Sequence, residues 1–186
     1  MFRIENKIGY YRRLKSAIFN SDMSKNRRNL PFRKNCGGYF LDGKGKIFAQ
    51  KNEQGLIIFP GGGIDAGESV EQEILRETFE ETGAKIINLK KLGNIKFIWG
   101  SNWAKTEKQK KRFQQFQGDD MYFFSGIVQE LTSEKLTEED SWKKNLFLGL
   151  DEVIETIASG QPFDKEIKEY RETQLKFLKV LKDRYA

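Results

Sequence analysis

The stretch GGGIDAGESVEQEILRETFEETG, residues 61–83, holds seven carboxylates, from Asp65 to Glu81, and a single cation, Arg76. The chain as a whole has 186 residues and a formal net charge of +6, so this stretch is acidic whereas the rest of the chain is basic. Carboxylates this close together repel one another unless a cation lies between them. The stretch therefore indicates a segment that binds a cation.

The same stretch has the pattern of a helix, which we expect over residues 68–82 with Gly83 as its C-cap. At roughly 100° per residue, four carboxylates share one sector of this helix. They are Glu73, Glu77, Glu80 and Glu81. A solvated acidic face is the ordinary explanation of such a helix. Here the apolar Val70 and Ile74 share a side with two of the carboxylates, which favours a site over a solvated face.

The chain contains no histidine and one cysteine, Cys36. The usual zinc ligand sets and the Ser-His-Asp and Cys-His arrangements need an imidazole or several thiols, so they are excluded. Any chemistry must rest on carboxylates, lysines or a bound metal. Clustered carboxylates suit a hard cation, and we expect Mg²⁺, with Mn²⁺ as the alternative. Cys36 cannot form an internal disulfide, and we expect it to be buried.

The length and the 38% hydrophobic content fit one domain with a real core. Local patterns predict the following elements: a hairpin over residues 37–50 with its turn at 42–45, a short strand over 56–59, one or two strands over 85–99, a strand over 121–128, and helices over 151–158 and 164–185. We expect residues 31–186 to form an α/β domain that ends in a helix. Residues 1–30 are expected to be a basic extension.

No stretch of the sequence approaches the roughly 20 apolar residues of a membrane span, and the first residues lack the apolar core of a signal peptide. We therefore expect a cytoplasmic protein with no membrane partner. The sequence leaves the oligomeric state open, with a homodimer as one option.

Seven identities at fixed spacing resemble the Nudix hydrolases, whose box reads G-x5-E-x7-R-E-U-x-E-E-x-G-U with U aliphatic. The matching residues are Gly62, Glu68, Arg76, Glu77, Glu80, Glu81 and Gly83. A chance match to all seven is on the order of 10⁻⁶. Thr78 and Ala84 stand where larger aliphatic residues are usual. The resemblance implies the Nudix α/β/α sandwich, with a mixed central sheet and a catalytic loop-helix-loop.

The resemblance also implies a magnesium-dependent reaction, in which water splits the diphosphate of a nucleoside diphosphate linked to another group X. It implies these roles: Glu77, Glu80 and Glu81 as metal ligands together with the Gly61 carbonyl, Arg76 and Glu68 as partners that hold the carboxylates in place, and Gly62 and Gly83 as structural glycines. The general base varies within the family. Glu80 or Glu81 is the first candidate here.

Asp119 and Asp120, just before the strand expected over residues 121–128, are further candidates for the base or for one more metal ligand. A plain loop in front of a strand is the alternative explanation of this pair.

The substrate is less specified. Residues 99–102 hold neither the proline typical of ADP-ribose specificity nor the tyrosine typical of dinucleoside polyphosphate specificity. Residues 103–116 carry five cations and one acid among aromatic residues, a composition suited to phosphates and stacked bases. This predicts substrate contacts from Lys110 and Arg112, with a solvated amphipathic loop or helix as the alternative. Lys51 is a further candidate, because many family members have a cation near the phosphates at this place.

Three functions remain after these observations. A hydrolase of a free nucleotide, such as a normal or damaged nucleoside triphosphate, comes first. Removal of diphosphate from the 5′ end of RNA is the enzymatic alternative, because the basic excess could engage several backbone phosphates. A non-catalytic Nudix-fold module that binds nucleotides is disfavoured, since the chain keeps every glutamate of the box.

Overall fold

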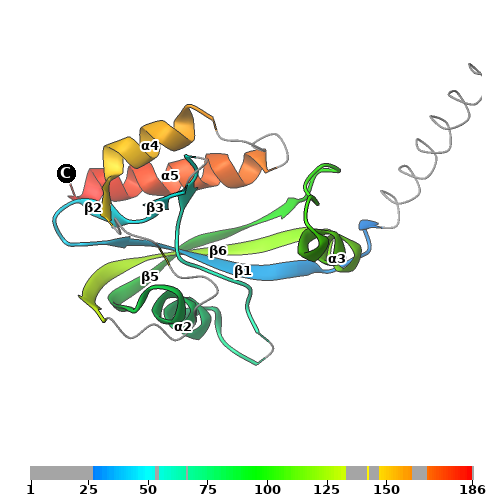
Figure 1. Ribbon diagram of the computed structural model, residues 1–186, viewed down its shortest axis with the longest axis horizontal. Helices are drawn as coiled ribbons and strands as arrows, with labels where there is room; N and C mark the ends of the chain where they lie inside the picture. Colours follow the sequence, from blue (N-terminus) through cyan, green and yellow to red (C-terminus); the bar gives the residue numbers. More distant parts are fainter. Residues whose placement is uncertain are drawn as a thin grey trace, which may run out of the picture.

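The computed structural model describes residues 27–52, 55–65, 67–132, 142, 147–160 and 167–185. At its centre lies a five-stranded sheet in the order β5-β6-β1-β2-β7 (Figure 1). The strands of this sheet are β1 (Phe32–Leu41), β2 (Lys46–Phe48), β5 (Ala84–Ile98), β6 (Gly118–Leu131) and β7 (Phe147–Gly149). β1 and β6 run parallel, whereas the other neighbours are antiparallel, so the sheet is mixed, as expected.

Helices cover both faces of this sheet (Figure 1). They are α2 (Val70–Thr82) on one face, and α4 (Leu150–Ala158) and α5 (Lys168–Tyr185) on the other. Because side chains alternate along a strand, β1 contributes to both cores. Phe40 packs in one cluster with Ile74 of α2, and Tyr39 packs in the other with Val153 and Leu178. The predicted α/β/α sandwich is therefore confirmed.

Several local predictions are confirmed. β1 and β2 form the expected hairpin, with Leu41 opposite Ile47. In its turn the Asp42 carboxylate accepts hydrogen bonds from the backbone N–H groups of Lys44 at 2.7 Å and Lys46 at 3.0 Å. β5 is one long strand rather than two, with irregular register at three places. The strand expected over residues 56–59 is shorter, because β4 (Ile57–Ile58) pairs only with β3 (Gln50–Lys51) in a separate small sheet.

β6 begins earlier than the sequence predicts, so Asp119 and Asp120 belong to the strand and not to a loop. The register of the β1–β6 pair explains this, because it sets Arg33 opposite Asp119 and Lys34 opposite Asp120. Opposite charges across a strand pair favour its extension. Adjacent residues of a strand point to opposite faces of the sheet, so the two aspartates point to opposite sides.

The basic segment after β5 forms a helix, α3 (Glu107–Gln115), at one end of the sheet (Figure 1). Aromatic stacking fixes this helix to the fold, because the Trp99 and Trp103 rings lie parallel at 3.8 Å and both stack with Phe113. The Arg27 guanidinium lies 3.3 Å from the centre of the Phe113 ring. It also donates to the carbonyls of Phe113, Phe116 and Gln117 at 3.0–3.1 Å. α3 is thus a fixed part of the domain.

The ends of the chain are described only in part. Residues 1–26 of the predicted extension lie outside the described residues, so its separation from the domain stays a prediction. The expected start of the last helix, at residue 164, also lies outside them, and α5 is described from Lys168. No helix in the described part of the chain is long and apolar enough to cross a membrane.

α2 begins at Val70, two residues after the predicted start at Glu68, because Ser69 is its N-cap. The Ser69 hydroxyl accepts from the Gln72 N–H, and the Gln72 side chain accepts from the Ser69 N–H in return. The small residues at the aliphatic positions of the box are accommodated, since Thr78 and Ala84 are both buried. The Thr78 hydroxyl donates to the Ile74 carbonyl at 2.6 Å. Gly83 ends the helix as expected, with φ 72°.

Replacing Gly83 with alanine should destabilise the fold more than the same change at Gly43. Both glycines have a left-handed backbone, with φ of 72° and 75°. That conformation alone costs an alanine about 1 kcal/mol. A methyl group at Gly83 would also lie 2.5 Å from the Thr132 carbonyl oxygen, whereas one at Gly43 meets no described atom within 4 Å. Urea unfolding should show an additional loss of about 1–3 kcal/mol for Gly83→Ala. Equal losses in both variants would contradict the packing described.

Candidate active site

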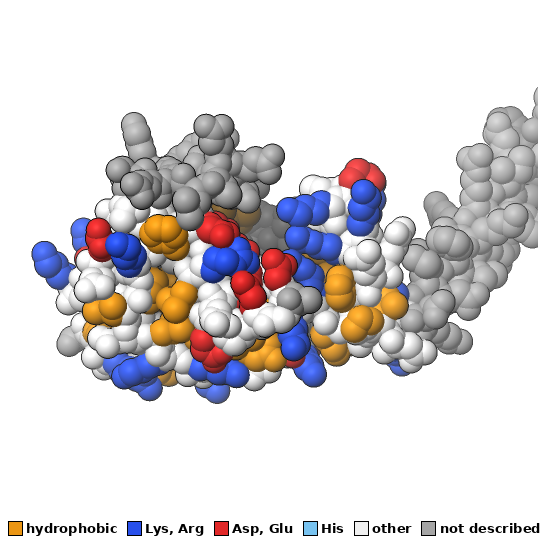
Figure 2. Space-filling view, turned by 90° about the horizontal axis from the view of Figure 1, so that it is seen from below, with side chains coloured by type: hydrophobic (Ala, Val, Ile, Leu, Met, Phe, Trp, Pro, Cys, Tyr) orange, Lys and Arg blue, Asp and Glu red, His pale blue; other side chains and the backbone are white. Residues whose placement is uncertain are grey.

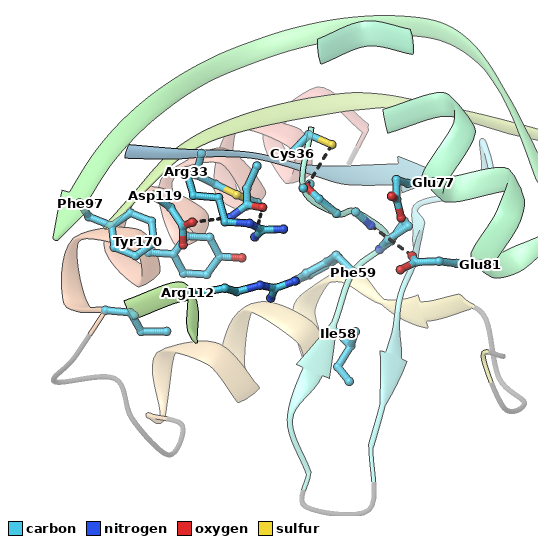
Figure 3. A pocket seen from close by; sticks show the side chains of 18 of the residues that line it. Arg33, Cys36, Ile58, Phe59, Glu77, Glu81, Phe97, Arg112, Asp119 and Tyr170 are labelled. Carbon is cyan, nitrogen blue, oxygen red and sulfur yellow. Dashed lines mark hydrogen bonds between the residues drawn. The ribbon is translucent and has the colours of Figure 1, made fainter. Parts of the chain in front are cut away.

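A pocket of about 680 Å³ opens on the α5 side of the sheet, next to β1 (Figure 3). Glu77 and Glu81 of α2 line it at one end. Asp119 of β6 and Tyr170 of α5 line it at the other end. The pocket therefore extends from the acidic helix α2 to the face of the sheet that α5 covers.

The glycines of residues 61–63 carry the backbone into this pocket along the edge of β1. The Cys36 and Gly38 N–H groups donate to the Gly62 and Pro60 carbonyls, both at 2.9 Å. A methyl group at Gly62 would lie 2.5 Å from the Glu77 carboxyl carbon, and one at Gly63 would overlap the Arg33 guanidinium. Glycine is thus required because two charged side chains approach the loop backbone.

Arg76 lies among the carboxylates of the acidic stretch. Its guanidinium nitrogens reach Glu73 at 2.5 Å, Glu80 at 2.6 Å, Glu68 at 3.3 Å, Glu77 at 3.4 Å and Asp65 at 3.7 Å. The hydrogen bond that Arg76 donates to the Glu73 carboxylate is the main cause of a raised Arg76 pKa. Arg76 thus pairs with the box carboxylates Glu77 and Glu80, as the resemblance implies, and Glu68 joins the same cluster.

Glu73 is a residue of this cluster to which the sequence analysis gave no role. Its side chain is fully buried, and its charge is balanced by Arg76. Burial of a carboxylate is costly without such a partner. The only local signal is its spacing three residues before Arg76, which places the two on one helix face.

The structure divides the four carboxylates of the predicted sector into two groups. Glu77 and Glu81 line the pocket, and the Gly61 N–H donates to Glu81 at 3.3 Å. Glu73 and Glu80 make the closest contacts with Arg76, and neither of them lines the pocket, whereas Glu77 lies 3.4 Å from Arg76. Gly61, Gly62, Glu77 and Glu81 are therefore brought together as predicted, while Glu80 lies to one side.

A magnesium ion fits the chemistry of this group. Two carboxylates on adjacent turns and the glycine backbone beside them supply the oxygen donors that Mg²⁺ prefers. Gly62 leaves the Glu77 carboxylate room against the loop. Among the residues that the structure describes, however, no three acidic or thiol side chains lie close enough together to hold a metal by themselves. Glu80 is a further carboxylate of the helix, and it is bound to Arg76.

Asp119 and Asp120 have different surroundings. Asp119 is buried in the pocket wall, where its carboxylate accepts from the Trp99 indole N–H at 2.8 Å and from the Asn35 amide. Burial raises the pKa of Asp119 to about 6, although the Trp99 hydrogen bond and the Arg33 charge oppose this rise. Asp120 does not line the pocket, and its carboxylate accepts from Asn94 at 3.0 Å and from Tyr122 at 3.2 Å. Only Asp119 is placed where it could act on a ligand.

The predicted substrate-binding cations are only partly at the pocket. Arg112 lines it, together with Lys108 one helical turn earlier. Lys110 points elsewhere, because a helix turns by roughly 100° per residue, and it pairs with Glu107 at 2.6 Å. Lys51 is exposed on β3 and does not line the pocket. The structure therefore does not bring Lys110 or Lys51 to this site.

Cys36 also lines the pocket, but it is no candidate nucleophile. The side chain is buried, as expected, and its thiol donates to the Gly62 carbonyl at 3.6 Å. Burial raises the pKa of the Cys36 thiol to about 12, so it stays protonated at neutral pH.

The fold and this pocket define a class: an α/β/α protein in which a glycine loop and an acidic helix meet at one site. A family model described as the NUDIX domain matches residues 31–170. The match covers most of the chain and includes every residue of the box. The chain belongs to the Nudix family.

The curated relatives match over shorter segments. The RNA pyrophosphohydrolase of Pseudoalteromonas atlantica is 36% identical over 85 residues, which cover 45% of this chain and 46% of that protein. YtkD of Bacillus subtilis, whose name assigns it provisionally to the 8-oxo-dGTP diphosphatases, is 31% identical over 98 residues, which cover 49% of this chain and 62% of YtkD. Both matches span less than two thirds of the relative's length.

Among solved structures, the MutT protein of Bacillus halodurans is similar with a TM-score of 0.46 and 23% identity, over 67% of this chain and 73% of that chain. A NUDIX hydrolase from Nitrosomonas europaea has a TM-score of 0.45 and 19% identity, over 76% of this chain and 90% of that chain.

Asp119 should make stability depend on pH between about 4 and 6. The pKa of Asp119 is about 6 in the folded protein, and its ordinary value of 3.8 applies in the unfolded chain, so the folded state binds the proton more tightly. The free energy of unfolding should therefore fall as the pH rises through this window, by roughly 3 kcal/mol for this group. Urea unfolding at pH 4 and at pH 6.5 measures the fall.

In Asp119→Asn the free energy of unfolding should not show this fall with pH, because an amide does not titrate. Its lost hydrogen bonds lower stability equally at both pH values, so they cancel in the comparison. Asp120→Asn is the matched control and should keep the fall. The same pH dependence in Asp119→Asn as in the wild type would show that Asp119 is not the group responsible.

Proposed function

We propose that this protein is a magnesium-dependent hydrolase that cleaves the diphosphate of a nucleoside diphosphate linked to a group X. One observation carries the proposal: Glu77 and Glu81 meet the glycine loop in a pocket that also contains Arg33 and Arg112. Carboxylates can hold a metal there, and the cations can hold the phosphates of the same substrate. A pocket of about 680 Å³ has the usual size of a small-molecule site.

Glu77, Glu81 and the Gly61 carbonyl are the proposed metal ligands, with Glu80 as a further one. Bound magnesium would neutralise phosphate charge and lower the pKa of a water molecule. The chain has no histidine that could activate the water as a general base. Arg76 keeps the carboxylates in place through its ion pairs with Glu73 and Glu80. Asp120 is not retained among the proposed ligands, since its partners lie away from the pocket.

Glu81 is our first choice for the group that takes the proton from the attacking water. Of the two glutamates that the sequence offered for this role, it alone lines the pocket, whereas Glu80 is bound to Arg76 at 2.6 Å. Asp119 is the second choice, because its raised pKa of about 6 suits proton transfer near neutral pH. It lies at the other end of the pocket from Glu81 (Figure 3).

A free nucleotide, such as a normal or damaged nucleoside triphosphate, is the first candidate substrate. The 5′ end of RNA is the second, favoured by the names of relatives in Pseudoalteromonas atlantica and Pelagibacter ubique and by the cations of α3 at the pocket. A cytoplasmic location and a homodimer stay predictions. A module that only binds nucleotides would show affinity without turnover.

Removal of the charge on Glu81 or Glu77 should lower turnover by at least about a hundredfold, as expected for a group that holds a metal at a transferring phosphoryl group. The variants are Glu81→Gln and Glu77→Gln, assayed by phosphate and diphosphate release from a panel of nucleotides with magnesium. Glu71→Gln, on the exposed side of the same helix, is the matched control and should keep wild-type turnover. Near-normal turnover in Glu81→Gln would contradict the assignment of Glu81 as a metal ligand.

Magnesium should also raise the melting temperature, because it binds the folded state and relieves repulsion between the carboxylates of α2. The rise should be smaller in Glu77→Gln and unchanged in Glu71→Gln. A thermal melt over a series of magnesium concentrations measures it. Equal rises in the wild type and in Glu77→Gln would place the bound ion elsewhere.

A further inference from the structure

Four cations line the pocket that contains the box glutamates. One of them, Arg171 of α5, donates to Gln174, and the other three come from two separate elements. Arg33 comes from β1, and Lys108 and Arg112 come from α3. Figure 3 shows the Arg33 and Arg112 side chains reaching into the space between Asp119 and the two glutamates of α2. In the space-filling view, Lys and Arg side chains gather over the α3 side of the molecule, beside the acidic group (Figure 2). Positive and negative side chains thus occupy adjacent parts of one cavity.

Arg33 and Arg112 lie close enough to repel each other. Burial lowers the pKa of Arg33 most, and the charge of Arg112 lowers it further. The charges of Asp119 and, less strongly, of Glu77 oppose this shift without cancelling it. Two guanidinium groups held together at a cavity wall cost free energy, and an anion between them relieves that cost.

The fold holds these cations in place. The Arg33 guanidinium lies against Gly63 and donates to Asn35, so the glycine loop and β1 both position it. α3 is fixed by the stack of Trp99, Trp103 and Phe113. Lys108 and Arg112 are four residues apart and therefore share the helix face that meets the pocket. The cluster is preformed, which lowers the entropic cost of binding an anion.

We propose that Arg33, Lys108 and Arg112 form an anion subsite that binds a phosphate of the substrate beyond the diphosphate held at Glu77 and Glu81. This inference rests on the proposed function, because it takes the box glutamates as the place of the cleaved diphosphate. It assigns the substrate to nucleotides with an additional phosphate. That phosphate can belong to a longer 5′ chain or to the 3′ side of the nucleotide, as in RNA.

Binding of ligands that this hydrolase cannot cleave tests the subsite. Adenosine 5′-monophosphate is compared with adenosine 3′,5′-bisphosphate, and α,β-methylene ADP with ATP that is methylene-bridged at both anhydride positions, by calorimetry with magnesium. In at least one pair the additional phosphate should tighten binding about tenfold, as charge-assisted hydrogen bonds do. The double variant Lys108→Gln/Arg112→Gln should lose most of that gain. The control Lys110→Gln/Lys111→Gln removes the same two charges from exposed positions of α3 outside the pocket lining, and it should keep the gain.

The pair that shows the gain identifies the source of the phosphate. A gain with the bridged triphosphate indicates a longer 5′ chain, and a gain with the bisphosphate indicates the 3′ side. An RNA source requires in addition that 5′-phosphorylated dinucleotides and longer RNAs bind at least as tightly as the bisphosphate, with the same loss in the double variant.

The subsite is refuted if neither pair shows a gain in the wild type, or if the gain survives in the double variant. Failure of the proposed function looks different. In that case the gain is present and is lost in the double variant, while no nucleotide of the hydrolysis panel is turned over with magnesium.

Discussion

Repulsion among the carboxylates of α2 is the constraint on which the rest of the site depends. Arg76 relieves it on one side of the helix by binding Glu73 and Glu80. Because Glu73 is fully buried, its charge requires this partner within the protein. Glu77 and Glu81 are left to face the glycine loop and the pocket. Arg76 therefore makes its closest ion pairs with the two carboxylates away from the pocket, and it reaches Glu77 only at 3.4 Å.

The second constraint is that β1 holds a different segment along each of its two edges. On one edge it pairs with β6 in parallel, which brings Arg33 opposite Asp119. On the other edge it holds the glycine loop through backbone hydrogen bonds from Cys36 and Gly38. The loop, β6 and α2 are far apart in the sequence, and β1 brings them to one pocket. The charges of that pocket follow from this arrangement: oxygen donors at α2 and cations at β1, α3 and α5.

Features with local signals could be predicted from the sequence. α2, its C-cap at Gly83, the hairpin and the pairing of Arg76 all depend on residues a few positions apart, and each is confirmed. Features set by contacts between distant segments could not be predicted. The sequence gives no sign that Arg33 would lie against Gly63, or that pairing with β1 would draw Asp119 into a strand. The composition of residues 103–116 indicated cations, but only the position of α3 selects Lys108 and Arg112 over Lys110 for the pocket.

The central claim is that the pocket beside the acidic helix directs water to a phosphorus atom of a diphosphate. The most direct measurement is hydrolysis of a nucleoside triphosphate, and of a triphosphate-ended RNA, in ¹⁸O-labelled water with magnesium. The account predicts that a P–O bond of the diphosphate breaks and that one labelled oxygen appears on a phosphate product of at least one substrate. Complete recovery of both substrates without label, by a folded protein that binds them, would contradict it.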